Sequence, residues 1–353
     1  MRVLVAMSGG VDSSVAAALM TDAGNEVVGV TLKLWSGPNG EAPTAGCCTV
    51  SDAEDARRVA AQLDIPYYVL DYSEEFRDGV VDRFVADYAS GRTPNPCIEC
   101  NRTVKFDQLL SRLEDFDCDI LVTGHHARTR FDGENWALHR GEDEAKDQSY
   151  VLSMLTQREL ARTRFPVGEL TKPQVRAVAA GMGLRTARKP ESMDICFVGQ
   201  RDYRGFLADH APEVFQPGEI VDISGNHLGV HEGIAGFTIG QRRGLGVAVG
   251  EPRFVVRIDQ GSSTVVLGQR DDLGVDEVTL EQITWTNGEP CSGPVMAQYR
   301  AHGDPAAAFL DGDRLRFDST QRAIAPGQTV AFYDQDMVLG GALIADSTSE
   351  HSR

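Results

Sequence analysis

The sequence predicts an α/β protein with a doubly wound, mostly parallel sheet, followed by two small β-rich domains of which the last is a β-barrel. Apolar strand segments alternate with helices over the first 200 residues, and this alternation is typical of parallel sheets covered by helices on both faces. After about Arg204, glycine and proline punctuate short β-prone segments, which indicates small sheets and barrels. A chain of 353 residues can bury more than one core. We therefore expect three domains, over residues 1–205, 206–270 and 271–353.

The N-terminal elements follow from local patterns. Short apolar segments predict buried strands, apolar residues repeated every three to four positions predict helices, and glycines mark helix ends at Gly24 and Gly91. A capping box at residues 51–54 and a capping serine, Ser73, predict two helix starts. The expected order is a strand over Arg2–Met7, a helix over Asp12–Ala23, a strand over Glu26–Lys33, a helix from Ser51 to Leu63, a strand over Tyr67–Asp71, a helix from Ser73 to Gly91, a helix from about Asn101 and a strand over Ile120–Thr123.

The C-terminal part of the chain has shorter strand signals. A glycine-rich stretch, Gly244–Gly250, lacks a strand-to-helix context, so we interpret it as a mobile or tightly turned loop. The segments that predict strands are Phe254–Ile258, Thr264–Leu267, Arg314–Phe317 and Thr329–Phe332.

Charge and cysteine content narrow the function classes. The net charge is −18, with 52 acidic and 34 basic residues, which argues against a nonspecific grip on a polyanion because phosphate contacts need clustered Lys and Arg. Short basic clusters such as Arg242–Arg243 are compatible with a nucleic-acid partner, although such clusters more often lie on a solvent-exposed face without binding phosphate. The apolar segment Val3–Ala6 is far too short for a signal or membrane segment, so we expect a cytoplasmic protein with no membrane partner. Seven cysteines in such a chain indicate reactive or metal-binding thiols.

The segment Ser8–Ser14, SGGVDSS, lies between the first predicted strand and the first predicted helix. Two glycines allow a tight turn, the helix N-terminus carries partial positive charge, and the serines add donors, so the loop suits a phosphate chain. It matches neither the Walker A pattern nor Gly-x-Gly-x-x-Gly, and a plain capped turn is the simpler alternative. It resembles the pyrophosphate loop of the N-type ATP pyrophosphatases, which cleave ATP between its α and β phosphates. In that interpretation Asp12 helps to hold Mg²⁺, a hard cation that prefers oxygen ligands.

A second candidate motif, Thr123–His126, ends a predicted sheet strand, where α/β proteins build their sites. Gly124 would allow backbone to approach a nucleotide, and His125 could donate to a phosphate or a base. A histidine pair on its own is usually structural. Its place at the end of a strand favours the functional interpretation.

Three thiols form the third candidate feature. Cys97 and Cys100 lie in GRTPNPCIECN, a proline-stiffened loop before a predicted helix, and a thiol at a helix N-terminus has its thiolate stabilised. Cys196 lies between Ile195 and Phe197, about a hundred residues later. Taken alone, Cys196 would more often be a packed core thiol, and the Cys-x-x-Cys a zinc half-site or a redox pair.

Together these strings resemble the bacterial tRNA-specific 2-thiouridylases, PP-loop ATP pyrophosphatases with an adenine nucleotide alpha hydrolase-like fold. The resemblance implies ATP-dependent adenylation of C2 of the wobble uridine in tRNA, then sulfur transfer from a cysteine persulfide with release of AMP and pyrophosphate. The strings occur in order from residue 8 to residue 246, and two C-terminal segments are similar as well. They are SGGVDSS, GRTPNPC-x-x-CN, TGHH, KDQSY (146–150), FPVGEL (165–170), ICFVG and TIGQRRGLG, with Gln298–Arg300 and Ala325–Gln328.

The resemblance also implies residue roles. Cys196 matches the persulfide carrier and Cys100 the second catalytic thiol, and the two can close a disulfide. The target base must be flipped, because C2 of a stacked base cannot meet both ATP and a cysteine. Partners would be tRNA, those for Lys, Glu and Gln in this family, and a persulfide donor such as a cysteine desulfurase or a relay protein. The implied contacts to ATP are Ala6, Met7, Ser8, Gly9, Gly10, Val11, Asp12, Ser13, Leu32 and Gly124, and those to tRNA are Asn95, Pro96, Cys97, His125, Lys146, Asp147, Gln148, Tyr299, Arg300 and Gln328.

Cys97 departs from the family pattern, which has Asp after Asn-Pro as a candidate general base. Cys97, Cys100 and Cys196 could instead be three ligands of a [4Fe–4S] cluster, leaving one iron open to a sulfide nucleophile. The favoured alternative is the persulfide route with Cys97 as an auxiliary thiol. A closed zinc site would need a fourth ligand, and Cys47 and Cys48 are better interpreted as packing or incidental thiols.

Two other functions remain open from the residues. One is an ATP pyrophosphatase that delivers nitrogen, which shares the loop but does not need Cys100 and Cys196; no glutaminase domain is recognisable. The other is a noncatalytic RNA-binding protein whose three thiols hold a structural metal.

Overall fold

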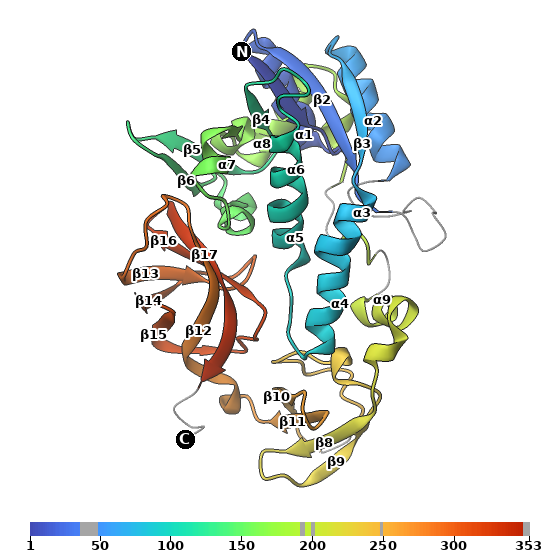
Figure 1. The fold of residues 1–353 in the computed structure, drawn as a ribbon, viewed down its shortest axis with the longest axis vertical. Coiled ribbons are helices and arrows are strands. Elements are labelled where there is room, and N and C mark those ends of the chain that lie inside the picture. Colours follow the sequence, from blue (N-terminus) through green and yellow to red (C-terminus); the bar gives the residue numbers. More distant parts are fainter. Residues whose placement is uncertain (36–48, 191–194, 199–201, 248–249, 349–353) are drawn as a thin grey trace.

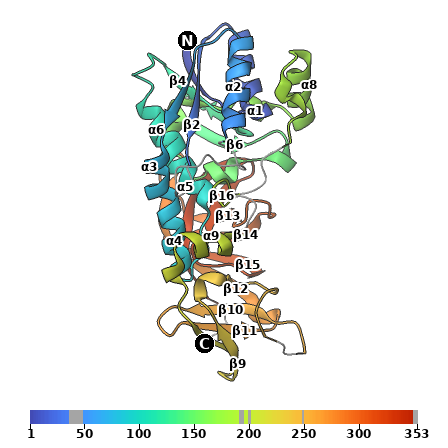
Figure 2. The same ribbon diagram turned by 90° about the vertical axis from the view of Figure 1, so that its right-hand side faces the viewer.

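The computed structural model describes residues 1–35, 49–190, 195–198, 202–247 and 250–348. Cys47 and Cys48 lie outside these residues, as do Ser192–Asp194 and Gly199 of the motif around Cys196. The molecule is elongated, with the N-terminal sheet at one end, a small four-stranded sheet at the other, and a barrel beside the helices that lie between them (Figures 1 and 2).

The N-terminal sheet confirms the predicted doubly wound parallel architecture. Its strand order is β3-β2-β1-β4-β7, and every neighbouring pair is parallel. The order reverses between β1 and β4, and ligands of such sheets bind at the carboxyl ends of the strands on either side of this reversal. The strands are β1 (Arg2–Ala6), β2 (Glu26–Lys33), β3 (Tyr67–Asp71), β4 (Ile120–Val122) and the short β7 (Thr163–Arg164), which the sequence did not predict.

Helices cover both faces of this sheet because its strands are apolar on both sides. Val3 and Val5 pack with one set of helices, whereas Leu4 faces the other, as expected for side chains that alternate along a strand. Ala16, Ala17 and Ala18 are fully buried, so α1 can approach the sheet closely. The first set of helices is α1 (Val11–Asp22), α2 (Val50–Gln62) and α8 (Lys172–Gly181), and the second includes α4 (Asp82–Ala89) and α6 (Asp107–Ser111).

The capping box of α2 is not the one predicted. The Thr49 hydroxyl accepts from the Asp52 amide at 3.1 Å, and the Asp52 carboxylate accepts from the Thr49 amide at 3.0 Å. The predicted box at residues 51–54 was therefore wrong, because Thr49-x-x-Asp52 and Ser51-x-x-Glu54 both match the Ser/Thr-x-x-Asp/Glu pattern. The register matters because it places the Asp52 carboxylate at the helix start.

Two long helical segments run side by side from the sheet toward the other domains (Figure 1). The first joins α3 (Ser73–Phe76) to α4 through a π-helical turn at Arg77–Val81, and the second joins α5 (Pro96–Glu99) to α6 through a π-helical stretch at Cys100–Phe106. Two predicted starts need correction: Tyr72 rather than Ser73 is the N-cap residue, and the second helix begins at Pro96 rather than near Asn101. The second segment therefore contains both Cys97 and Cys100.

The central region forms a separate four-stranded sheet in the order β10-β11-β8-β9. The predicted strands at Phe254 and Thr264 are confirmed, while β8 and β9 had no clear sequence signal. Helix α9 (Tyr203–His210) leads into this region, and the Tyr203 ring stacks on Tyr88 of α4 with centroids 4.5 Å apart. The strands are β8 (Gly218–Asp222), β9 (His227–His231), β10 (Phe254–Asp259) and β11 (Thr264–Gly268).

The C-terminal region confirms the predicted barrel. Six antiparallel strands close on themselves in the order β12-β15-β14-β13-β16-β17, with β12 pairing with β17. Closure removes the exposed edges of a sheet. The strands are β12 (Gly274–Trp285), β13 (Gly293–Gln298), β14 (Ala306–Asp311), β15 (Arg314–Arg322), β16 (Thr329–Asp334) and β17 (Met337–Thr348).

A hairpin from the N-terminal region extends the barrel sheet. Strands β5 (Ala127–Phe131) and β6 (Trp136–Arg140) follow directly after β4, and β6 pairs with β17 through Leu138 and Val338. Arg128 reinforces this contact with an ion pair to Asp336 at 3.1 Å. The short helix α7 (Gln157–Ala161) lies next to β6. The sequence did not predict this hairpin, which joins the first region to the last.

The loop between α4 and α5 joins these N-terminal helices to the barrel and to the central region. The Thr93 amide donates to the Pro326 carbonyl of the barrel at 2.8 Å, and the Thr93 hydroxyl hydrogen-bonds to Thr238 of the central region. Arg92 pairs with Glu281 on β12. Gly327 packs so closely that a Cβ there would lie 3.0 Å from the Thr93 nitrogen. We call residues 91–95 with these partners the interdomain junction.

Candidate active site

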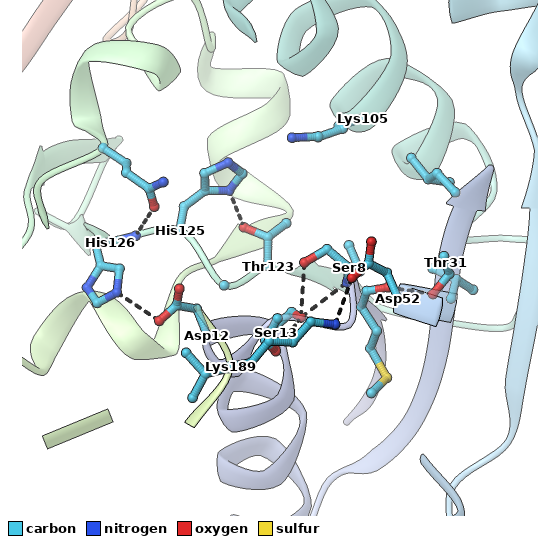
Figure 3. Close-up of a pocket in the computed structure, with 18 of the residues that line it drawn as sticks. Ser8, Asp12, Ser13, Thr31, Asp52, Lys105, Thr123, His125, His126 and Lys189 are labelled. Atoms are coloured by element: carbon cyan, nitrogen blue, oxygen red, sulfur yellow. Dashed lines mark hydrogen bonds and ion pairs between the residues drawn. The ribbon is translucent and has the colours of Figure 1, made fainter. Parts of the chain in front are cut away.

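A cavity of about 300 Å³ lies at the carboxyl ends of β1 and β4, where the strand order reverses. The Ser8–Asp12 loop enters it after β1, and Thr123–His126 enters after β4 (Figure 3). The N-terminus of α1 begins at Val11 within this cavity, so backbone N–H groups and the helix dipole favour a bound anion. The apolar side chains Leu32 and Leu34 line the cavity from the end of β2. The cavity thus has both a polar and an apolar region.

The phosphate-type loop is held by its own side chains and requires glycine. Gly9 has a φ of +72°, and a Cβ there would lie 2.1 Å from the Asp52 carbonyl oxygen. The Ser13 hydroxyl accepts from the Ser8 amide at 3.1 Å, and the Ser14 hydroxyl donates to the Gly10 carbonyl at 2.7 Å. The loop is therefore shaped for a ligand before one binds.

Lys189 ties this loop to α2. Its Nζ donates to the Gly9 carbonyl at 3.0 Å and to the carboxylates of Asp52 and Asp55, each at 2.7 Å. Burial opposes the charge of Lys189, but the hydrogen bonds and charges of both carboxylates outweigh it, so its pKa is raised. Lys189 is therefore charged at neutral pH, and the corrected capping box explains why Asp52 is in place to receive it.

The turn after β4 packs directly on the loop. A Cβ on Gly124 would lie 2.5 Å from the Ser13 nitrogen, so this position requires glycine. Burial, together with the charges of Lys105 and His126, lowers the pKa of His125 to about 3. Its Nδ1 lies 2.7 Å from the Thr123 hydroxyl. His125 is therefore neutral at physiological pH and offers a hydrogen bond, not a charge, to a ligand.

Asp12 occupies the polar end of the cavity. Its two carboxylate oxygens lie 2.9 and 2.8 Å from the Lys172 Nζ, and Oδ1 lies 3.1 Å from His126 Nε2. Burial opposes the negative charge, but these two partners outweigh it and lower the pKa of Asp12. Asp12 is thus a carboxylate with a cation already beside it.

Lysine is concentrated at this cavity. The chain has 34 basic residues, of which only five are lysines, and four of these five line the cavity: Lys105, Lys146, Lys172 and Lys189. Lysine presents a compact ammonium that suits phosphate oxygens. The strongly acidic chain therefore gathers most of its lysines at one cavity, where two of them pair with carboxylates.

The three candidate thiols lie outside the lining of this cavity. Cys97 is exposed in the first turn of α5, where the Asn95 side chain accepts from the Ile98 amide as the helix cap. Cys100 is 6% exposed and begins the π-helical stretch, a geometry that often marks functional sites. Five residues further along, Lys105 reaches the cavity (Figure 3). One helical segment therefore holds the Cys100 thiol and, less than about two turns further along, the Lys105 side chain that lines the cavity.

Cys196 packs against the same apolar core as Cys100. Its neighbour Phe197 anchors the segment, with ring centroids 5.1 Å from both Phe84 and Phe206. Among residues 1–35, 49–190, 195–198, 202–247 and 250–348, no three His, Cys, Asp or Glu side chains are grouped so that they could hold a metal ion. The described geometry therefore does not assemble the three thiols as cluster ligands.

Comparison with known proteins decides among the candidate functions. Family models match along the chain as "tRNA methyl transferase HUP domain" at residues 1–200, "tRNA methyl transferase PRC-barrel domain" at 204–269 and "Aminomethyltransferase beta-barrel domain" at 275–344. The tRNA-specific 2-thiouridylase MnmA of Roseiflexus castenholzii is 46% identical over 98% of this chain and 99% of its own. Those of Moorella thermoacetica and Acidothermus cellulolyticus are each 48% identical, over 97% and 98% of this chain and 98% of their own. The chain belongs to the MnmA family.

One of the solved structures that the chain resembles is a distant match. A 4-thiouridine synthetase–RNA complex with bound ATP covers 60% of this chain and 51% of its own, at 16% identity and a TM-score of 0.35. A likeness at that level carries no argument. In the part of the chain that the structure describes, no helix is both long and apolar enough to cross a membrane.

The cavity brings together most of the residues expected to contact ATP in an MnmA-family protein. Gly9 is the exception, because it shapes the loop from behind. Sequence reasoning missed several lining residues, which come from distant segments and share no local motif. The expected residues that line the cavity are Ala6, Met7, Ser8, Gly10, Val11, Asp12, Ser13, Leu32 and Gly124, and the missed ones include Thr31, Leu34, Asp52, Lys105, Lys172 and Lys189.

The residues expected to contact tRNA divide into three groups. His125, Lys146 and Gln148 line the cavity, and Gln148 accepts from the His126 amide at 2.9 Å. Asp147 is buried between them, where its carboxylate accepts from Arg140 at 2.8 Å and from the Ser149 hydroxyl at 2.8 Å, so it shapes the segment. The remaining residues lie on other segments: Asn95 in the interdomain junction with Pro96 and Cys97 directly after it, and Tyr299, Arg300 and Gln328 on the barrel.

The barrel residues in the last group are partly occupied by contacts within the barrel. The Tyr299 hydroxyl donates to Gln321 at 3.0 Å, and the exposed Arg300 donates to the Arg322 and Ala323 carbonyls at 2.8 and 3.0 Å. The Gln328 side chain accepts from the Ala325 amide at 2.9 Å and so supports the turn at the junction.

The contact between the two turns predicts that Gly124→Ala weakens ATP binding at least tenfold. The added methyl group would overlap the Ser13 backbone, so the loop must move. Equilibrium binding of ATP to the folded variant measures this effect. Gly181→Ala is the matched control, because a Cβ there meets no atom within 4 Å. ATP affinity in Gly124→Ala equal to that of the unmodified protein would contradict the close packing described here.

Proposed function

We propose that this chain is a tRNA 2-thiouridylase, a sulfurtransferase that converts the wobble uridine of tRNA to 2-thiouridine with ATP. The observation that carries the proposal is the single helical segment Pro96–Ser111, which holds Cys100 and extends Lys105 into a phosphate-type cavity. Membership of the MnmA family supports it. It also separates the chain from amide-forming ATP pyrophosphatases and from noncatalytic RNA-binding proteins.

The first step activates the uridine. The Ser8–Ser13 loop and the lysines hold the phosphates of ATP, while Leu32 and Leu34 border the adenine. The C2 oxygen of the flipped base attacks the α phosphorus, and pyrophosphate leaves. Asp12 fits a magnesium ion as one hard oxygen ligand beside phosphate oxygens, and such an ion would neutralise charge on the leaving pyrophosphate.

The second step delivers sulfur. The terminal sulfur of a Cys196 persulfide attacks C2, and AMP leaves with the former C2 oxygen. The Cys100 thiolate then attacks the Cys196 sulfur, which releases 2-thiouridine and forms a disulfide between the two cysteines. A thiol reductant restores both thiols before the next persulfide is loaded. The packing of Cys100 and Cys196 on one core supports this division of roles.

The partners follow from the same proposal. The substrates are tRNAs, those for Lys, Glu and Gln, and the sulfur donor is a cysteine desulfurase or a relay protein acting in the cytoplasm. Asn95, Pro96 and Cys97 would surround the flipped base, and Tyr299, Arg300 and Gln328 would contact tRNA from the barrel. The three sheets would act as domains over residues 1–205, 206–270 and 271–353.

Nucleoside mass spectrometry of unmodified tRNA tests the activity and the roles of the thiols together. With ATP, Mg²⁺ and a persulfide donor, the unmodified protein should form 2-thiouridine. Cys196→Ser should form none yet still release pyrophosphate when tRNA is present, because adenylation precedes sulfur attack. Cys291→Ser, which changes a half-buried barrel cysteine, is the control and should remain active. Normal 2-thiouridine formation by Cys196→Ser would remove Cys196 from its role.

Cys97→Asp distinguishes the persulfide route, which we favour, from an iron–sulfur route. Aspartate restores the residue of the family pattern, so under the persulfide route thiolation should be unchanged or faster. Under the cluster route, protein prepared without oxygen should contain about four irons per chain, and a harder oxygen ligand should weaken iron binding. The measurements are the iron content and the thiolation rate of the unmodified protein and of Cys97→Asp. Loss of thiolation together with loss of iron in Cys97→Asp would overturn the persulfide route.

A further inference from the structure

Lys172 begins α8 and lies 160 residues from its partner Asp12. Its amide donates to the Asp143 carboxylate at 2.8 Å, and its Nζ lies 2.8 and 2.9 Å from the two Asp12 oxygens. Only 9% of the side chain is exposed. The backbone of Lys172 is therefore held by Asp143, and its ammonium lies at the wall of the cavity beside Asp12.

This corner of the cavity is its phosphate end. Asp12 is the second residue of α1, whose N-terminus faces the cavity, whereas the apolar residues lie at the end of β2. A phosphate chain placed at the helix N-terminus meets the Asp12 carboxylate, and like charges there must be neutralised. Lys189 cannot do this without leaving Gly9, Asp52 and Asp55, to which it is already bonded. Lys172 is the cation in direct contact with Asp12.

His126 is the second side chain that contacts Asp12 at this corner. A carboxylate accepts hydrogen bonds, so the His126 Nε2 that faces Asp12 carries the hydrogen (Figure 3). The opposite ring nitrogen, Nδ1, is buried and has no hydrogen-bond partner among the described residues, and the residue is 2% exposed. Buried polar atoms in native proteins usually have partners. This unpartnered nitrogen is not the one that faces Asp12.

We propose that Lys172 is a phosphate-binding residue, which pairs with Asp12 in the structure described here and contacts the β and γ phosphates when ATP is bound. The long, flexible lysine stem allows the ammonium to move from Asp12 to a neighbouring phosphate without moving α8. Asp12 is then available as an oxygen ligand for the cation that accompanies ATP. The inference rests on the proposed use of ATP but not on sulfur transfer.

Nucleotide binding without tRNA or sulfur donor tests the proposal. Isothermal titration of ATP and AMP in the presence of Mg²⁺ should show that Lys172→Met weakens ATP binding at least tenfold and leaves AMP binding within about twofold. AMP is the matched ligand because it lacks the β and γ phosphates. Lys172→Arg keeps the charge and should retain most of the ATP affinity. Lys33→Met changes the one lysine that is not among the residues lining the cavity and should bind both nucleotides normally.

Each other outcome overturns the proposal. Unchanged ATP affinity in Lys172→Met would show that Lys172 makes no phosphate contact, and equal losses for ATP and AMP would show that it only shapes the loop. If Lys172→Met is too unstable to titrate, Lys172→Gln replaces it, because glutamine can still donate to Asp12. It should likewise weaken ATP binding at least tenfold and leave AMP binding within about twofold. The two proposals fail separately, because a protein that forms no 2-thiouridine can still show a loss confined to ATP.

Discussion

The hydrogen bond from the Thr93 amide to the Pro326 carbonyl is the contact on which the arrangement of the site depends. It fixes the loop that leads into Cys97 and Cys100 against the barrel, while Thr238 fixes it against the central sheet. The β5–β6 hairpin is a second link between the N-terminal region and the barrel, because β6 pairs with β17. The loop that leads to Cys97 and Cys100, the residues proposed to border the flipped base and the barrel residues proposed to contact tRNA are therefore positioned by one junction, although they lie more than 200 residues apart in sequence.

From this junction the segment Pro96–Ser111 leads back to the ATP cavity. Its π-helical stretch begins at Cys100 and includes Lys105, so the thiol and the cavity share one rigid element. The same cavity gathers four of the five lysines in a chain with a net charge of −18. Concentrating compact cations at one place allows an acidic protein to bind a polyphosphate without a general affinity for polyanions.

Local patterns predicted the first βαβ unit and the SGGVDSS loop, because each depends on neighbours in sequence. The sequence also marked Gly124, but the contact that requires glycine there is with the remote Ser13. The capping box of α2 was wrong by two residues, since its register is also set by Lys189, 137 residues away. The β5–β6 hairpin and Lys172 were missed because their partners, Val338 and Asp12, are remote. The placement of the cysteines relative to the cavity depends on the junction, which no local motif describes.

The most direct test is a substitution at the junction, followed by separate measurement of ATP binding and of tRNA thiolation. In Gly327→Val, a branched side chain replaces a residue whose φ is +87° and whose Cβ would already lie 3.0 Å from Arg92 and Thr93. Because the cavity is built from the N-terminal sheet and its adjoining segments, the variant should bind ATP within about twofold of the unmodified protein. It should form 2-thiouridine in tRNA at least tenfold more slowly, because the thiol loop is displaced. Thiolation at the unmodified rate, or an equal loss of ATP binding, would contradict the account.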